Sequence, residues 1–189
     1  SGAGPGIYPS EEFTDVCYYL AFLNSKMSYY LTTCLNPTVN TTQGDLKRIP
    51  FVKPEEKIQK EISDLAKRNI AIRKNICSFS WINVEFKISP FNLSNESEIK
   101  KRIKVFFDHE NFINAQVLLN EAIINEKIFE VYDLTFADKE MVLIKEGESI
   151  GGLPVSKEAK EAYLQNDVEE FPLDNIRDFI QNLPEQEFT

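Results

Sequence analysis

The chain has 189 residues but only one histidine and three cysteines, and each scarcity excludes a class of function. Hydrolytic zinc sites usually need two or three histidines, and serine or cysteine triads need a histidine held by partners. The single His109 follows Phe107 and Asp108, and we interpret it as a surface histidine on a helix. The scattered cysteines form neither an even disulfide framework nor a CxxC pair. We therefore expect a chain without metal or covalent chemistry of its own, in a reducing cytoplasm.

Long apolar runs are also missing. No stretch approaches the roughly 20 apolar residues that cross a bilayer, and no signal-like segment opens the chain, so we expect no membrane partner. An apolar fraction of 42% argues against wholesale disorder, and seven glycines with nine prolines argue against a fibrous chain. The composition suits one globular domain, or one with an appendage.

Charge is unevenly distributed along the chain, which carries a net charge of -9. Residues 43–104 hold 14 basic and 8 acidic side chains, whereas residues 105–189 hold 6 basic and 19 acidic ones. A basic middle followed by an acidic end predicts two surfaces with different partners, although lysines that solvate helix faces explain the first equally well.

The first fifty residues predict a mainly α fold with a small β component (α+β). Residues 10–35 have apolar side chains at helical spacing after Ser10, a good N-cap, and we expect one largely buried helix. A polar loop at 38–44 and a short turn at 45–48 follow. Residues 49–53 are expected to be extended, with Pro50 placing them at an edge.

A long helix over 54–78 carries the strongest pattern. Apolar residues alternate at spacings of four and three over three heptads, which is typical of a helix that packs along one seam. The seam consists of Ile58, Ile62, Leu65, Asn69, Ile72, Ile76 and Phe79. Asn69 is its polar member, and such an amide disfavours wrong registers because a misaligned partner leaves it unpaired.

A second helix over 97–132 offers a matching seam, in which Asn120 is the polar member. Its other members are Ile99, Ile103, Phe106, Ile113, Val117, Ile124 and Ile128. Antiparallel helices set each a position against a d position. The two patterns therefore predict an antiparallel pair with an Asn69–Asn120 layer, packed against helix 10–35.

The remaining segments give weaker signals. Residues 79–88 alternate like an extended strand or a strap over the helices, and the only tryptophan, Trp81, is expected to serve packing. Short acidic helices are expected at 156–164 and 173–183. We divide the chain into residues 1–53, an antiparallel helical spacer at 54–134, and an acidic C-terminal extension with short helices at 135–189.

The order of several short motifs is familiar. Leu23-Asn24-Ser25 is followed by Leu35-Asn36-Pro37-Thr38, then by Gly44 through Pro50, and then by an acidic start to a long helix. This order resembles the C-terminal target-recognition and spacer-helix region of adenine-specific DNA methyltransferases, namely the type IIG restriction-modification enzymes and the PglX-like enzymes of BREX phage defence. Specificity subunits of type I restriction systems share a looser version. Phe79-Ser80-Trp81 and residues 120–134 are also similar to the PglX-like group.

The resemblance implies that residues 1–53 end a target-recognition region and that this chain is a non-catalytic, C-terminal fragment of a bacterial or archaeal methyltransferase. The family needs a glycine-containing S-adenosylmethionine motif and an Asn/Asp-Pro-Pro-aromatic motif, and neither is present. Asn36-Pro37-Thr38-Val39 does not replace the second. We therefore expect no cofactor in this chain and S-adenosylmethionine in its parent.

The same resemblance implies a double-stranded DNA partner, bound through the parent. Polar side chains of the loop can bond base edges or phosphates, and neighbouring cations can contact phosphates. The candidate DNA-binding residues are Asn40, Thr41, Thr42, Gln43, Lys47, Arg48, Lys53 and Lys57. Basic helix faces extend this surface, through Lys67, Arg68, Arg73 and Lys74 and through Lys100, Lys101, Arg102 and Lys104.

A second hypothesis is a protein-interaction or scaffold element. In it, the helix pair holds the recognition region relative to the methyltransferase domain of the same parent. The acidic end docks another defence-system subunit or imitates the charge of DNA, which accounts for the acidic half better than DNA recognition does.

Overall fold

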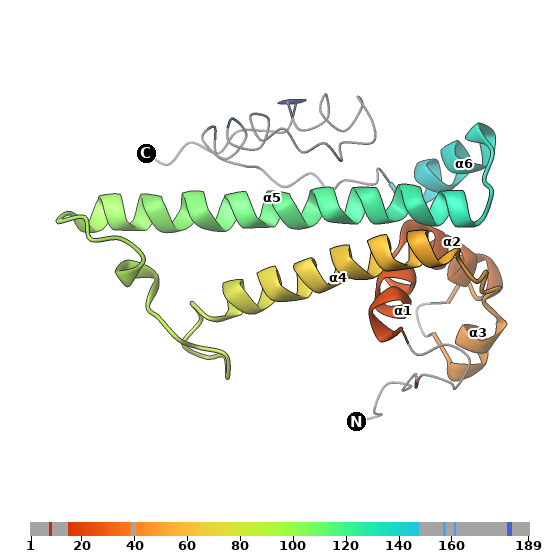
Figure 1. Cartoon of the computed structure of the whole chain (residues 1–189), viewed down its shortest axis with the longest axis horizontal. Coiled ribbons are helices and arrows are strands. Elements are labelled where there is room, and N and C mark those ends of the chain that lie inside the picture. Colours follow the sequence, from red (N-terminus) through yellow and green to blue (C-terminus); the bar gives the residue numbers. More distant parts are fainter. Residues whose placement is uncertain are drawn as a thin grey trace. The chain divides into compact units, whose positions relative to one another are not determined.

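The computed structural model describes Tyr8, residues 15–38, residues 41–147, and the isolated positions 157, 161, 181 and 182. This part of the chain is helical, with six α-helices and one short 3-10 helix (Figure 1). They are α1 (Val16–Leu23), α2 (Lys26–Leu35), α3 (Gln43–Arg48), α4 (Glu56–Cys77), η1 (Pro90–Asn92), α5 (Ile99–Val131) and α6 (Phe136–Glu146). No described helix is long and apolar enough to cross a membrane.

The expected small β component is wrong for the described residues, none of which forms a strand. Residues 45–48, expected to be a turn, belong to helix α3. Residues 79–88 form successive turns. A strand needs a neighbouring strand to satisfy its backbone groups, and these segments satisfy theirs through caps and turns instead.

The expected helix over 10–35 is two helices, because Ser25 begins a new one; residues 10–14 lie outside the described part. Ser25 has extended backbone angles, and its hydroxyl accepts a hydrogen bond from the Ser28 amide at 3.2 Å. The same hydroxyl donates to the Phe22 carbonyl at the end of α1, at 2.6 Å. One side chain thus ends one helix and caps the next.

The chain divides into two compact units, and α4 and α5 each run through both. Unit 1 comprises Ser1–Lys67 with Ile124–Ser149, and unit 2 comprises Arg68–Ile123 with Ile150–Thr189. Most of the two acidic helices expected at 156–164 and 173–183 lies outside the described residues. The division of the chain into residues 1–53, 54–134 and 135–189 remains a prediction. It is based on sequence motifs, whereas the two units are defined by packing.

Unit 2 contains the Asn69–Asn120 layer, which confirms the prediction. The Asn120 amide donates to the Asn69 side-chain oxygen at 2.8 Å, and its own oxygen accepts from Gln116 at 3.2 Å. Further along, Arg73 donates to Asn114 at 3.1 Å. As residue numbers rise along α4 they fall along α5, so the two helices are antiparallel in this unit (Figure 1).

Unit 1 contains the apolar continuation of the seam. Ile62, Leu65, Ile124 and Ile128 are buried there. Lys127 of α5 and Glu61 of α4 form an ion pair at 2.5 Å, a spacing that fits the same antiparallel register. Ile99 was expected in the seam but is 68% exposed, because it is the first residue of α5, at the far end of the pairing in unit 2.

Candidate nucleic-acid interface

The loop and helix expected to contact DNA are organised by a reciprocal cap. The Thr42 hydroxyl accepts from the Asp45 amide at 3.3 Å, and the Asp45 carboxylate accepts from the Thr42 amide at 2.9 Å. This capping box satisfies two backbone donors at the start of α3 and allows a six-residue helix to form despite Gly44. The Thr42 hydroxyl also donates to Asp45, so its structural role is to cap the helix.

Asn36 connects this cap to the end of α2. Its amide donates to the Asp45 carboxylate at 2.8 Å, while its side-chain oxygen accepts from the backbone and hydroxyl of Thr38. The Asn36 bond, followed by the bonds from Thr42, lowers the pKa of Asp45 below its ordinary value. Asn36, Thr42 and Asp45 therefore fix the backbone that presents the neighbouring basic side chains.

The segment after α3 is anchored by an aromatic cluster in unit 1. The Phe51 ring stacks on Tyr19 at 5.0 Å between centroids and meets the rings of Tyr18 and Phe22 edge-on. The Tyr132 hydroxyl donates to the Pro50 carbonyl at 2.5 Å, and burial raises the pKa of Tyr132 to about 12. Residues 49–53 are thus held on α1 and on the end of α5.

Motif residues also meet at the start of α2. The Asn125 side chain accepts from the Lys26 amide at 2.8 Å, which satisfies one of the donors left free at a helix N-terminus. The Lys26 ammonium in turn donates to the Glu146 carbonyl, the last residue of α6. Helix α6 and the capping role of Asn125 were not expected from the sequence, although Thr135 and Asp138 form a capping box like that of α3.

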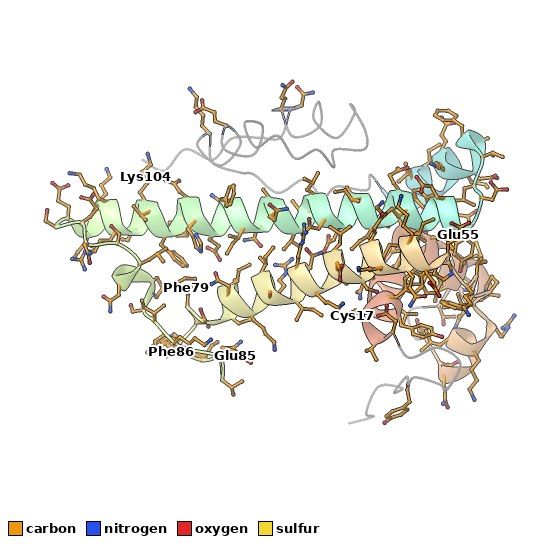
Figure 2. The ribbon with its side chains drawn as sticks, viewed as in Figure 1. Cys17, Glu55, Phe79, Glu85, Phe86 and Lys104 are labelled. Atoms are coloured by element: carbon orange, nitrogen blue, oxygen red, sulfur yellow. The ribbon has the colours of Figure 1, made fainter. Side chains whose placement is uncertain are left out.

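The four candidate phosphate contacts are all exposed. Lys47 and Arg48 end α3, Lys53 lies in the segment before α4, and Lys57 lies in the first turn of α4. Arg48 approaches Asp45 only to 4.0 Å, which leaves its guanidinium free to exchange partners. Glu55, labelled in Figure 2, and Glu56 are exposed among these cations, so the local charge is mixed.

Among the candidate base contacts, Thr41 and Gln43 are exposed, and Thr42 caps α3. Asn40 lies outside the described residues. In unit 2, two of the basic residues expected to extend the surface already have protein partners: Arg73 bonds Asn114, and Arg102 bonds the Phe91 and Glu96 carbonyls. Arg73 and Arg102 are therefore removed from the candidate surface, which centres on residues 41–57.

No group of three His, Cys, Asp or Glu side chains suited to a metal ion occurs among the described residues. His109, the only histidine, lies 3.4 Å from the Asn75 side chain and meets the Phe79 ring edge-on. His109 lies on a helix, as expected, and contacts the end of α4 within unit 2.

Comparison with known proteins finds a distant relative. The chain is 29% identical over 106 residues to the adenine-specific methyltransferase BrxX of Escherichia coli O9:H4 (strain HS). The match covers 56% of this chain and 8% of that enzyme's length. No family model and no solved structure matches. The chain is therefore distantly similar to a small part of a methyltransferase of the group that the motifs resemble.

Proposed function

We propose that this chain is a non-catalytic part of an adenine-specific DNA methyltransferase and contributes to DNA target recognition. The observation that carries the proposal is the support beneath residues 41–57. Exposed cations are presented there by a backbone that Asn36, Asp45 and Tyr132 hold in place. The similarity to BrxX supports the choice of enzyme.

In this proposal Lys47, Arg48, Lys53 and Lys57 contact phosphates and fix the register of the protein on the duplex. Such contacts carry no sequence information themselves. Asn40, Thr41 and Gln43 read base edges. Methyl transfer from S-adenosylmethionine takes place in the remainder of the enzyme. Because few contacts come from this chain alone, we expect weak binding by the isolated chain.

The test is the salt dependence of DNA binding. The double variant Lys47→Gln/Arg48→Gln removes two phosphate contacts, so the slope of log K against log salt should fall by about 1–2. Fluorescence anisotropy with a labelled duplex at several salt concentrations measures the slope, first on the isolated chain and then on the methyltransferase that contains it.

The matched control is Lys60→Gln/Lys87→Gln, which removes two exposed cations that belong to none of the candidate DNA-binding groups. Its slope should equal that of the unchanged protein. An unaltered slope in the Lys47/Arg48 variant, or equal losses in both variants, would mean that residues 41–57 do not contact DNA.

A scaffold role is the second candidate, and the Asn69–Asn120 layer favours it. A polar layer in an otherwise apolar seam fixes the register of two helices, as a spacer of defined length requires. Gel filtration of the chain with the remaining methyltransferase polypeptide separates the two roles. Assembly without DNA supports the scaffold, and retention of DNA supports recognition.

A further inference from the structure

Asn125 is a buried polar residue on α5 whose side-chain bond joins distant parts of the chain within unit 1. The residue is 5% exposed, and its side-chain oxygen accepts from the backbone amide of Lys26, 99 positions earlier in the chain. Its neighbours Ile124 and Ile128 are buried apolar residues. A buried hydrogen bond adds little net stability but fixes the position of its two partners, since a buried polar group without a partner is costly.

The group that Asn125 binds is the start of α2. Lys26 is the first residue of this helix, and the amides at a helix N-terminus have no partner within the helix. Ser25 caps the Ser28 amide, and Asn125 takes the Lys26 amide at 2.8 Å. The Lys26 ammonium also donates to the Glu146 carbonyl at the end of α6, at 2.6 Å. Helices α5 and α6 therefore hold the start of α2 from outside.

The other end of α2 holds α3. Asn36 follows the last residue of α2, and its amide donates to the Asp45 carboxylate of the capping box at 2.8 Å. Helix α2 has 10 residues and so spans about 15 Å. Because a continuous helix of this length moves as a unit, a shift at its start is carried to α3. Lys47 and Arg48, at the end of α3, shift with it.

The other two cations of the candidate surface have separate supports. Lys53 follows a segment that stacks on α1 through Phe51 and that accepts from the Tyr132 hydroxyl. Lys57 lies in the first turn of α4. These supports do not pass through α2, so loss of the bond at Asn125 should affect the two pairs of cations unequally.

We infer that Asn125 is a positioning residue for DNA contact: by holding the start of α2, it sets where Lys47 and Arg48 meet the phosphates of the duplex. The inference rests on the proposed function, because it concerns the same surface. It goes beyond that proposal by assigning a role to a buried residue that does not itself contact DNA.

The test measures the salt dependence of DNA binding by the methyltransferase that contains this chain. Asn125→Leu keeps a side chain of similar size and removes the acceptor. The slope of log K against log salt should fall by about 1–2, as in Lys47→Gln/Arg48→Gln, because the same two phosphate contacts lose their alignment. Added to Lys47→Gln/Arg48→Gln, Asn125→Leu should lower the slope no further. Added to Lys53→Gln/Lys57→Gln, it should lower the slope as much as it does alone.

Matched variants separate positioning from a general loss of stability. Asn125→Asp keeps an acceptor for the Lys26 amide and should restore the slope. Asn120→Leu removes another buried amide of α5, in unit 2, and should leave the slope unchanged. Lys26→Pro removes the amide donor at a helix position that accepts proline, after the extended Ser25, and should lower the slope as Asn125→Leu does. Lys26→Gln keeps that amide and should leave the slope unchanged.

Failure of the inference differs from failure of the proposed function. If Lys47→Gln/Arg48→Gln leaves the slope unchanged, these residues do not contact phosphates, and both the proposed function and the inference are overturned. If that variant lowers the slope but Asn125→Leu does not, or does so equally when Lys47 and Arg48 are already replaced, only the inference is overturned. Equal losses in Asn125→Leu and Asn120→Leu would also overturn it, because they would make the effect one of general stability.

Discussion

The same two helices are joined by different chemistry in the two units. In unit 1, α4 and α5 bury apolar side chains such as Ile62 and Ile128, each 0% exposed, beside the Lys127–Glu61 ion pair. In unit 2 their contacts include amide pairs such as Asn69–Asn120 and Arg73–Asn114. Burial of apolar surface stabilises without direction, whereas paired amides stabilise little but select one register. Because Val117, Leu119 and Ala122 of unit 2 are buried as well, the comparison indicates that apolar burial stabilises both units and that the amide pairs of unit 2 add the selection of one register.

The largest expected effect is a cavity in unit 1. Phe129→Ala removes a fully buried ring and should lower the free energy of unfolding by about 3–5 kcal/mol. Ile76→Ala removes a half-buried side chain in unit 2 and should cost only about 1–2 kcal/mol. Urea unfolding followed by circular dichroism measures both. Equal costs would contradict the dependence of the stability loss on burial at these two sites.

A smaller effect is expected at the amide layer. Asn120→Ala leaves the Asn69 oxygen without its donor in a largely buried place, which should cost about 1–3 kcal/mol. The matched control is Asn114→Ala, which removes the bond from the exposed Arg73 and should cost less than 1 kcal/mol or so. If the two variants were equally stable, the layer would have no special role.

Replacing both partners of the layer sharpens the distinction between stability and alignment. Asn69→Leu/Asn120→Leu continues the apolar seam and should recover the stability lost in Asn120→Ala, or exceed that of the unchanged chain. The register should become less specific, with faster amide hydrogen exchange in residues 79–88 and the adjoining turns of unit 2. Unchanged exchange beside higher stability would show that other contacts set the register.

The amide layer was predictable because its signal is periodic. Spacings of four and three over many residues place Asn69 and Asn120 in seams whose antiparallel register follows from the apolar neighbours. Short elements lack this redundancy. Apolar spacing runs unbroken through Asn24 and Ser25, so the division between α1 and α2 depends on a single serine cap.

The capping boxes of α3 and α6 have a recognisable sequence pattern. Thr42 and Asp45, and likewise Thr135 and Asp138, have the Thr-x-x-acid spacing of a capping box, and each begins a helix. The bond between Asn125 and the Lys26 amide could not be predicted, because the two residues are 99 positions apart along the chain. The sequence also does not show that Trp81, expected to serve packing, is 86% exposed, because burial depends on tertiary neighbours.

The smallest effect is expected from acid, and it separates the units by their chemistry. Hydrogen bonds lower the pKa of Asp45 in unit 1 below its ordinary 3.8, whereas the Asn69–Asn120 pair of unit 2 does not titrate near that pH. The stabilisation from the Asp45 carboxylate is complete above the unfolded pKa of about 3.9 and is lost as the pH falls through the lowered folded value.

Amide hydrogen exchange of α3 should therefore quicken, after correction for intrinsic rates, as the pH falls below about 4, while the Asn69 and Asn120 amides should not follow this titration. Asp45→Asn removes the charge but keeps an acceptor for the Thr42 amide, so the pH dependence at α3 should flatten with the helix retained. Persistence of the same acid step in Asp45→Asn would assign it to another carboxyl group of unit 1. Asp15, Glu61 and Asp138 are the alternatives, because hydrogen bonds lower the pKa of each of these carboxyl groups as well.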